Sequence, residues 1–404
     1  MITKINNINQ IISWDVKNNN LKVIKNSDIL IENDKIIKIG KNLNDDKINK
    51  IIDAEDGIVS PGFIDCHTHP IFNDNRSLDF KSRIEGKSYK EISNSGGGIN
   101  SSVDSLRSIS KKSLYLKILP RVISFLKKGT TTIEAKSGYG LSTESEIKSL
   151  EIIKELDKNT ELDIIPTFMA AHDFPKEYKM KEDEYVDLIC KEMIPVVSKK
   201  KLAIFCDVFC EKGYFSIEQS RKILKTGIKY GLQPKLHADE FIDSNAANLA
   251  AEINAVSADH LMFSSIENLK KMSNKNVISV VLPGTTFFLG KSDYVDCNKI
   301  IKAGGEVAIA TDFNPGSSYM QSMPFIMLLS NLYCNLSLDL SFKACTYNAA
   351  RALGIENSYG LIETGYKADM LIWNLKNIHS IPYSFDDQNK LKHVIKSGRL
   401  LNWN

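Results

Sequence analysis

The sequence lacks the features that mark exported, membrane-spanning and nucleic-acid-binding proteins. Residues 1–20 hold no apolar core of signal-peptide length before charges and asparagines interrupt them. No window approaches about 18 uninterrupted apolar residues, and the most hydrophobic stretch, 277–289, is broken by Pro283. The formal net charge is only +3, with lysines interspersed among acidic residues, which argues against a nucleic-acid partner. We therefore expect a cytoplasmic protein that binds neither nucleic acid nor membranes.

Cysteine is scarce as well, with seven among 404 residues. In a chain without an export signal we expect these cysteines to be reduced thiols. Cys206 and Cys210 lie four apart in an apolar run. This spacing differs from that of zinc ribbons and favours buried structural thiols over metal ligands. The 43% hydrophobic and 25% charged content is typical of globular proteins, so we expect a sizeable core.

Short apolar runs rich in β-forming residues recur along the middle of the chain, each followed by a charged segment of helical period. Eight runs are predicted as strands: 58–69, 130–136, 162–172, 202–210, 234–240, 255–261, 277–283 and 306–312. Helices are predicted between them, at 114–128, 144–158, 183–199, 216–230, 243–251, 264–274 and 294–303. Gly129, Gly227 and Gly231 lie where such helices should stop.

This alternation predicts an α/β fold, a TIM-like (β/α)8 barrel over residues 58–354, because crossover helices keep all eight strands parallel. The connection 70–113 is too long for one helix, so we expect an inserted loop over the mouth of the barrel. The flanks, 1–57 and 355–404, hold alternating apolar and polar stretches. They predict a small composite β domain, a β-sandwich assembled from both chain termini.

Histidines are concentrated where a barrel enzyme has its active site. Only His379 and His393 fall in the flanks, and both are predicted to be surface residues. The other five lie at the C-terminal ends of predicted barrel strands: His67, His69, His172, His237 and His260. Because catalytic residues of barrel enzymes come from these strand ends, we expect the five rings to gather around one site.

Four of these strand-end residues predict a metal centre. Alternation along a strand points the rings of His67 and His69 to the same side, so the pair can grip one ion. A lone His-x-His is a weak signal, but His237 at the fifth strand and Asp312 at the eighth complete a set of three imidazoles and a carboxylate. Such a set suits Zn or Fe and leaves a position open for water. The alternative is four separately satisfied core residues.

The segment 61–69 (PGFIDCHTH) resembles the first-strand signature of the amidohydrolase superfamily, and 365–371 (GYKADML) resembles the return of its chain into the small β domain. Within that superfamily, the chain from about residue 55 to residue 375 resembles the imidazolonepropionases. The specific stretches are 95–100 (SGGGIN), 134–141 (EAKSGYGL), 183–195 (DEYVDLICKEMIP), 205–213 (FCDVFCEKG), 236–241 (LHADEF), 257–260 (SADH), 282–290 (LPGTTFFLG) and 311–317 (TDFNPGS).

The resemblance implies hydrolysis of 4-imidazolone-5-propanoate to N-formimidoyl-L-glutamate, with one Zn or Fe ion per subunit and a homodimer. A metal ion lowers the pKa of bound water from about 16 to about 7, and the resulting hydroxide would attack the ring carbonyl. Asp312 would take the proton of that water, His260 would stabilise the oxyanion, and Glu240 would contact the ring nitrogens and shuttle a proton. The alternative for Glu240 is an exposed, salt-bridging glutamate.

The resemblance also implies a set of substrate contacts. Arg76 would bind the propionate, since a guanidinium can hold a carboxylate through two charge-assisted hydrogen bonds. The further contacts would be Tyr139, His172, Asn314, Gly316 and Ser317. Turn formation beside glycine and proline is the alternative for Tyr139 and Asn314.

Two further signals have other interpretations. Gly96, Gly97 and Gly98 are followed by no Gly-Lys-Ser/Thr, so they form no P-loop, and we expect part of a lid or a subunit contact. Lys136 could bridge two metals as a carbamate, as in binuclear relatives. With enough other ligands for one ion, we favour a structural or hydrogen-bonding lysine.

Two other functions remain possible at this point. A deaminase of the same superfamily, acting on another nitrogen heterocycle, would have nearly the same metal chemistry. Arg76 favours an anionic substrate, and release of ammonia would favour the deaminase. A non-catalytic scaffold with the same fold would have lost ligands, whereas here every proposed ligand and acid–base residue is present.

Overall fold

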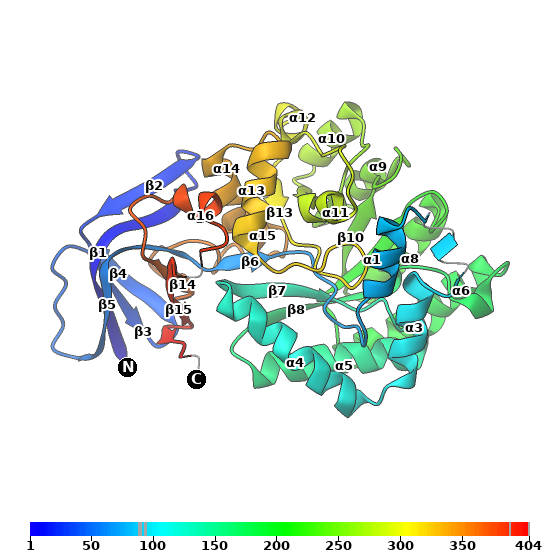
Figure 1. Cartoon of the computed structure of the whole chain (residues 1–404), viewed down its shortest axis with the longest axis horizontal. Helices are drawn as coiled ribbons and strands as arrows, with labels where there is room; N and C mark the ends of the chain where they lie inside the picture. Colours follow the sequence, from blue (N-terminus) through cyan, green and yellow to red (C-terminus); the bar gives the residue numbers. More distant parts are fainter. Residues whose placement is uncertain (88–90, 93–94, 388, 403–404) are drawn as a thin grey trace.

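Two eight-stranded sheets organise the chain in a computed structural model that describes residues 1–87, 91–92, 95–387 and 389–402. One sheet is built from the two ends of the chain, and the other from its middle. In Figure 1 the terminal sheet lies on the left and the middle of the chain forms the larger body on the right. Within the described residues, no helix is long and apolar enough to cross a membrane.

The strands of the middle sheet pair in chain order and in parallel. They are β6 (Phe63–Asp65), β7 (Thr130–Lys136), β8 (Asp163–Ala171), β9 (Phe205–Cys210), β10 (Gln233–Ala238), β11 (Ser257–His260), β12 (Ile278–Val281) and β13 (Val307–Ile309). A parallel bridge between Thr68 and Phe313 joins the two ends of the row. The predicted (β/α)8 barrel is therefore confirmed.

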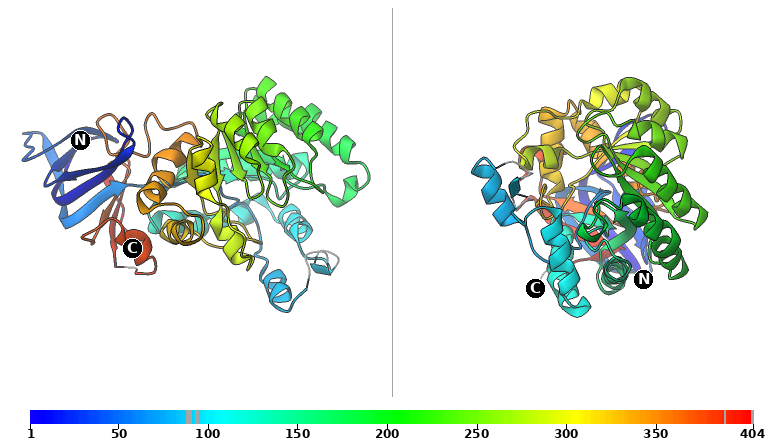
Figure 2. Two further views of the ribbon diagram at one scale, coloured as in Figure 1. Left: turned by 90° about the horizontal axis from the view of Figure 1, so that it is seen from above. Right: turned by 90° about the vertical axis from the view of Figure 1, so that its right-hand side faces the viewer.

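Helices surround the barrel, as the view in Figure 2 along the longest axis shows. They are α1 (Ser77–Ile84), α3 (Ile99–Ser108), α4 (Lys111–Lys127), α5 (Thr143–Asn159), α6 (Glu182–Leu188), α7 (Ile194–Lys199), α8 (Ile217–Lys229), α9 (Ala246–Glu252), α10 (Ile266–Ser273), α11 (Pro283–Phe288), α12 (Cys297–Lys302), α13 (Met323–Tyr333), α14 (Leu338–Ala344), α15 (Tyr347–Arg351) and α16 (Ser380–Tyr383). Two short helical turns, η1 (Lys176–Tyr178) and the π-helical η2 (Ile189–Met193), also lie in the described part of the chain.

The helix boundaries follow local chemistry. The side chain of Ser142 accepts a hydrogen bond from the Ser145 amide and caps the start of α5. Gly129 and Gly231 follow α4 and α8 with positive φ angles of 88° and 85°, the conformation that glycine adopts most easily. The prediction for Gly227 was wrong, because this glycine lies inside α8 and packs against Cys206.

The terminal sheet has the order β16-β15-β14-β5-β1-β3-β4, with β2 paired to β1. Its strands are β1 (Ile2–Asp15), β2 (Asn20–Lys25), β3 (Asp28–Glu32), β4 (Lys35–Gly40), β5 (Ile48–Pro61), β14 (Met370–Trp373), β15 (Leu391–Lys396) and β16 (Arg399–Leu400). Hydrogen bonds join all of them into one sheet, and the predicted β-sandwich stays a prediction. The domain boundaries stay a prediction, and strand β5 runs across the one placed at residue 58.

The predicted strand 58–69 is two strands in the structure. Residues 58–61 belong to β5 and pair with β14 of the terminal sheet, whereas β6 is the first barrel strand. Within its described residues, the inserted connection 70–113 carries helices α1 and α3, where we expected a loop. Residues 88–90 and 93–94 of this connection, like 388 and 403–404 near the C-terminus, lie outside the described residues.

Candidate active site

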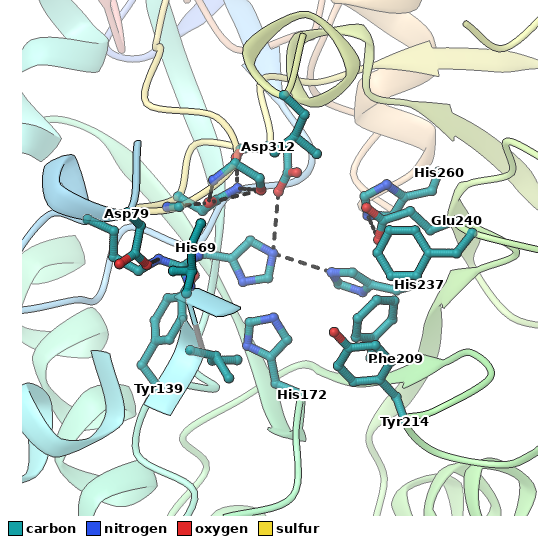
Figure 3. A pocket seen from close by; sticks show the side chains of 18 of the residues that line it. His69, Asp79, Tyr139, His172, Phe209, Tyr214, His237, Glu240, His260 and Asp312 are labelled. Atoms are coloured by element: carbon teal, nitrogen blue, oxygen red, sulfur yellow. Dashed lines mark hydrogen bonds and ion pairs between the residues drawn. The ribbon is translucent and has the colours of Figure 1, made fainter. Parts of the chain in front are cut away.

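A pocket of about 460 Å³ opens at the C-terminal ends of the barrel strands. Its lining includes His69 from the end of the first barrel strand, His237 from β10, His260 from β11 and Asp312 from beyond β13. Figure 3 shows these side chains converging with His172 and Glu240 on one cavity. The structure thus brings together strand-end residues that are far apart in the sequence.

Four donor atoms meet at the floor of this pocket. The Nε2 atom of His69 lies 3.2 Å from Nε2 of His67 and 3.3 Å from Nε2 of His237. Oδ1 of Asp312 lies 3.5 Å from Nε2 of His67 and 3.6 Å from Nε2 of His69. Four ligands placed about 2.0–2.1 Å from a tetrahedral ion are separated by about 3.3–3.4 Å. These four separations fit ligands of one ion: His67, His69 and Asp312 form a compact group, and His237 adjoins it through His69.

The protonation and orientation of the imidazoles also fit a metal. Burial lowers the pKa of His67 and His69 well below the ordinary value, which keeps both rings neutral. Nδ1 of His67 donates to Asp259 at 2.6 Å, and Nδ1 of His237 donates to Asp207 at 3.1 Å. A carboxylate on Nδ1 fixes the tautomer whose Nε2 lone pair is free to bind a metal.

Two other groups of ligand-type atoms lie close together. His260 forms a compact group with His67 and His237, so it stands at the edge of the same centre. Glu134 and Asp259 form a group with His67, but Lys235 lies 3.1 Å from Glu134 and Lys136 lies 3.7 Å from Asp259. Because ammonium groups already neutralise these carboxylates, we assign the ion to the group that contains Asp312.

The backbone is strained at two of the site residues. His260 and Asp312 have φ angles of 77° and 51°, in the left-handed region that non-glycine residues seldom adopt. Thr285 donates from Oγ1 to Oδ2 of Asp312 at 2.5 Å, so the other carboxylate oxygen faces the histidines. Such strain persists where surrounding contacts hold it and is common at functional sites.

Glu240 is more buried than the exposed, salt-bridging glutamate of the alternative interpretation would be. Its side chain lines the pocket and is only 13% exposed, and its Oε2 lies 3.6 Å from Nε2 of His260. Burial, followed by the nearby charge of Asp312, raises the pKa of Glu240 to about 8. The group is therefore protonated at neutral pH and able to donate.

The inserted connection supplies one wall of the pocket through Arg76, Asp79, Arg83, Ile92 and Ile99. Oδ2 of Asp79 lies 4.0 Å from Nε of Arg76 and accepts a hydrogen bond from the Gly98 amide at 2.8 Å. The triple-glycine turn therefore holds the aspartate that lies beside the arginine. The predicted role of these glycines in a lid or a subunit contact stays a prediction.

Tyr139 and His172 also line the pocket. The buried carboxylate of Glu146 accepts hydrogen bonds from the amides of Gly138, Gly140 and Leu141, which fixes the loop that carries Tyr139. Nδ1 of His172 donates to the Gly138 carbonyl at 2.9 Å. Burial lowers the pKa of His172 to about 3, so the neutral ring offers Nε2 as an acceptor.

The loop after Asp312 brings Asn314, Gly316 and Ser317 to the pocket. The side-chain oxygen of Asn314 accepts from the amides of Gly316 and Ser317 at 2.8 and 2.7 Å, and its amide nitrogen donates to the Asp312 carbonyl. These bonds support turn formation as one role of Asn314. The part that these three residues play toward substrate stays a prediction.

Sequence reasoning missed several residues of the site. Phe209, Tyr214, Phe241, Leu289 and Lys291 add an aromatic and cationic side to the pocket. It also missed Asp207 and Asp259, which are fully buried in β9 and β11. A charged residue inside a buried barrel strand was the available signal, because unpaired charges are seldom fully buried.

A profile of the amidohydrolase family matches residues 58–401, and the chain belongs to this family. It is 41% identical over 389 residues to the imidazolonepropionase of Clostridium tetani (strain Massachusetts / E88), covering 95% of this chain and 92% of that protein. It is 43% identical over 394 residues to the imidazolonepropionase of Geobacillus kaustophilus (strain HTA426), again covering 95% and 92%. Within the amidohydrolases, the chain groups with the imidazolonepropionases.

Solved structures share the fold at much lower identity. The atrazine chlorohydrolase TrzN from Arthrobacter aurescens TC1, complexed with zinc, superposes with a TM-score of 0.72 at 15% identity, covering 99% of this chain and 95% of that one. A Xaa-Pro dipeptidase with bound methionine in the active site gives a TM-score of 0.73 at 15% identity and covers 100% of both chains. These likenesses support the fold alone.

Proposed function

We propose that this chain is a metal-dependent hydrolase that opens 4-imidazolone-5-propanoate to N-formimidoyl-L-glutamate, a step of histidine degradation. The observation that carries the proposal is the convergence of four donor atoms beside a pocket that also presents Arg76 and Glu240. His67, His69, His237 and Asp312 would hold a Zn or Fe ion, which supplies Lewis acidity and lowers the pKa of the water that it binds.

Arg76 would bind the propionate of the substrate. A guanidinium offers a planar pair of N–H donors that match a carboxylate, and Nε of Arg76 is buried without a hydrogen-bond partner among the described residues. Binding of the propionate on this wall directs the ring toward the histidines. Tyr139 and His172 would flank the ring, and Nε2 of His172 would accept a hydrogen bond from a ring N–H.

Asp312 and His260 would act on the attacked carbonyl. Oδ1 of Asp312 faces the two nearest imidazoles and would accept the proton of the attacking water. His260 lies beside Glu240 on the same side of the cavity and would donate to the carbonyl oxygen as negative charge develops there. Such fixed donors in a water-poor site stabilise charge strongly.

Glu240 would complete the ring opening. The water oxygen bonds to the carbonyl carbon, the carbon–nitrogen bond of the ring breaks, and the departing nitrogen must gain a proton. Glu240, protonated at neutral pH because its pKa is raised to about 8, would supply that proton. Asp312 would hold the proton taken from water until Glu240 is reprotonated.

The experiment is a coupled assay on protein of known metal content. Urocanase would generate the unstable imidazolone in place, its ultraviolet absorbance would be followed, and the product would be identified by mass spectrometry. We expect loss of absorbance well above the spontaneous rate, abolished in His237→Ala and Asp312→Ala, with formimidoylglutamate as product. No acceleration by the metal-loaded enzyme, or release of ammonia in place of a ring-opened acid, would overturn the proposal.

We also propose that the chain works in the cytoplasm and as a homodimer. The homodimer comes from the family resemblance. The seven cysteines are free, buried thiols, which suits a reducing compartment. Sedimentation of the purified chain would test the dimer.

A further inference from the structure

A buried charge cluster fills the barrel directly beneath the histidines. It consists of two ammonium and three carboxylate groups, all on barrel strands and all with side chains 0% exposed: Glu134, Lys136, Asp207, Lys235 and Asp259. Fully buried charges are rare and costly unless they are paired. The cost of keeping five of them beneath a metal centre points to a role.

Lys136 is the group in this cluster that joins the others. Its Nζ lies 2.6 Å from Oδ2 of Asp207, 2.9 Å from Oε1 of Glu134 and 3.7 Å from Oδ2 of Asp259. The two aspartates are the ones that accept the Nδ1–H groups of His237 and His67. One ammonium group therefore contacts both carboxylates that orient two of the three imidazole ligands.

We infer that Lys136 is a positioning residue for the metal centre, which holds Asp207 and Asp259 in place so that His237 and His67 present Nε2 to the ion. The inference rests on the metal site proposed above. It also accounts for a lysine that no step of the proposed reaction uses, and it leaves the carbamate interpretation without support, because Lys136 already donates to Glu134 and Asp207.

Two opposing effects make the inference testable, because they predict opposite changes in metal affinity when Lys136 is removed. An ammonium group near a divalent cation repels it, so on charge alone the removal of Lys136 would tighten metal binding. If Lys136 acts through the aspartates, its removal leaves two carboxylates without their shared cation, and the imidazoles lose their fixed orientation. Loss of such outer contacts typically weakens metal binding by about 10–100-fold.

Lys235 provides a matched control within the same cluster. It is equally buried and equally charged, but its Nζ contacts Glu134 at 3.1 Å and the carbonyls of Cys66 and Ala352 at 3.3 and 3.4 Å. No hydrogen bond or ion pair joins Lys235 to Asp207 or Asp259 in the described part of the chain. Its removal costs a buried charge pair and breaks no direct contact with the carboxylates that orient the ligands, although the charge of Lys235 also lowers the pKa of Asp259.

The experiment measures zinc affinity of the full chain, stripped of metal and titrated with zinc against a competing chelator. For Lys136→Met we expect binding about 10–100-fold weaker than wild type and an altered visible spectrum of the cobalt-substituted protein. For Lys235→Met we expect lower thermal stability with zinc affinity within about threefold of wild type. Unchanged or tighter zinc binding in Lys136→Met, or an equal loss in both variants, would overturn the inference. A wild-type chain that binds no zinc or iron would instead overturn the proposed function.

A second variant covers the case in which Lys136→Met does not fold. In Lys136→Met/Asp207→Asn the side chain at 207 no longer needs a cation, while its amide oxygen can still accept the Nδ1–H of His237. We expect this double variant to fold and to bind zinc more tightly than Lys136→Met/Asp207→Ala. It should also bind zinc more tightly than Lys136→Met, where that variant can be purified. No difference between Asn and Ala at position 207 would contradict a positioning role.

Discussion

The guanidinium of Arg76 lies directly against the backbone of Gly316. A Cβ atom built on Gly316 would overlap Nη2 and Cζ of Arg76, a closer approach than any side chain allows. The Arg76 amide also donates to the Pro315 carbonyl at 3.2 Å, so backbone and side chain are both held by the same loop. The residue at position 316 therefore decides where the guanidinium of Arg76, the proposed binding group for the propionate, points.

Gly316→Ala should raise KM for the imidazolone substrate by about tenfold or more, because the methyl group displaces the guanidinium and a charge-assisted hydrogen bond contributes about 1.5–3 kcal/mol. The change in kcat should be smaller, since the metal ligands do not move. Gly40→Ala is the control, because a Cβ at Gly40 meets only Leu43 at an ordinary distance of 3.4 Å. Equal KM values in wild type and Gly316→Ala would argue against a role for Arg76 in substrate binding.

The pH dependence of kcat/KM should reflect the loss of the proton of Glu240. Burial and the charge of Asp312 raise the pKa of this carboxyl to about 8, so its proton is present at neutral pH and is lost as the pH rises through that value. A bound cation acts in the opposite direction and moves the midpoint lower. We expect kcat/KM to fall on the alkaline side, with a midpoint at or below about 8, as measured from about pH 6 to 10 after correction for spontaneous decay.

Glu240→Gln is the companion variant. Glutamine cannot deliver a proton, so kcat should fall by about 10²-fold or more, and the alkaline loss should disappear from the residual activity. An unchanged alkaline limb in Glu240→Gln would assign that limb to another group.

The strand ends could be predicted from the sequence because apolar runs and the histidines that follow them are local features. Thr130–Lys136 was predicted at its observed bounds, and His237 and Asp312 were predicted at strand ends, from which both line the pocket. The resemblance to a known family then supplied roles that spacing alone leaves open. Local pattern and family likeness together predicted the metal centre.

What could not be predicted depends on contacts between distant segments. Residues 58–65 (IVSPGFID) are mostly apolar and continue into β6, so nothing local indicated that 58–61 pair with β14, more than 300 residues away in the chain. The partners of Lys136 lie on β7, β9 and β11, and only closure of the barrel decides which buried lysine meets which aspartate. Register and closure are properties of the whole sheet.

The metal content of alanine variants should distinguish the residues that bind the ion from those that only lie beside it. His69→Ala should lose the ion, because Nε2 of His69 lies among the four donor atoms. His260→Ala should retain it and lose activity, although His260 groups with His67 and His237. Metal analysis after gel filtration, with and without a chelator, checks both. Loss of the ion in His260→Ala would instead assign it to the group that contains His260.

The same experiment has a stability readout. Ligand binding to the folded state stabilises it by about 2.7 kcal/mol when the free metal is about 100 times the dissociation constant. The wild-type chain should therefore melt at a lower temperature after chelation and recover with added zinc or iron. In His69→Ala the melting temperature should not respond to the metal. A response equal to that of wild type would place His69 outside the binding set.

The junction between the two sheets depends on Lys396. Its Nζ lies 2.6 Å from Oδ2 of Asp163 at the start of β8 and 2.6 Å from Oδ2 of Asp369 beside β14, and its side chain is only 1% exposed. Lys396→Met leaves two carboxylates without their main cation, and breaking a buried pair in this way costs about 3–5 kcal/mol. Urea unfolding followed by circular dichroism measures that loss.

Lys367→Met is the matched control for this junction. Lys367 reaches the same Asp163 oxygen at 3.4 Å, but its side chain is 23% exposed, and a partly solvated ion pair contributes at most about 1 kcal/mol. We therefore expect a clear difference in the midpoint of unfolding between the two variants, with zinc affinity unchanged in both, because the junction lies at the opposite end of the barrel strands from the ligands. Equal costs would mean that solvent screens Lys396 as well, and the terminal sheet would then be held to the barrel mainly by apolar contacts such as that between Phe63 and Trp373.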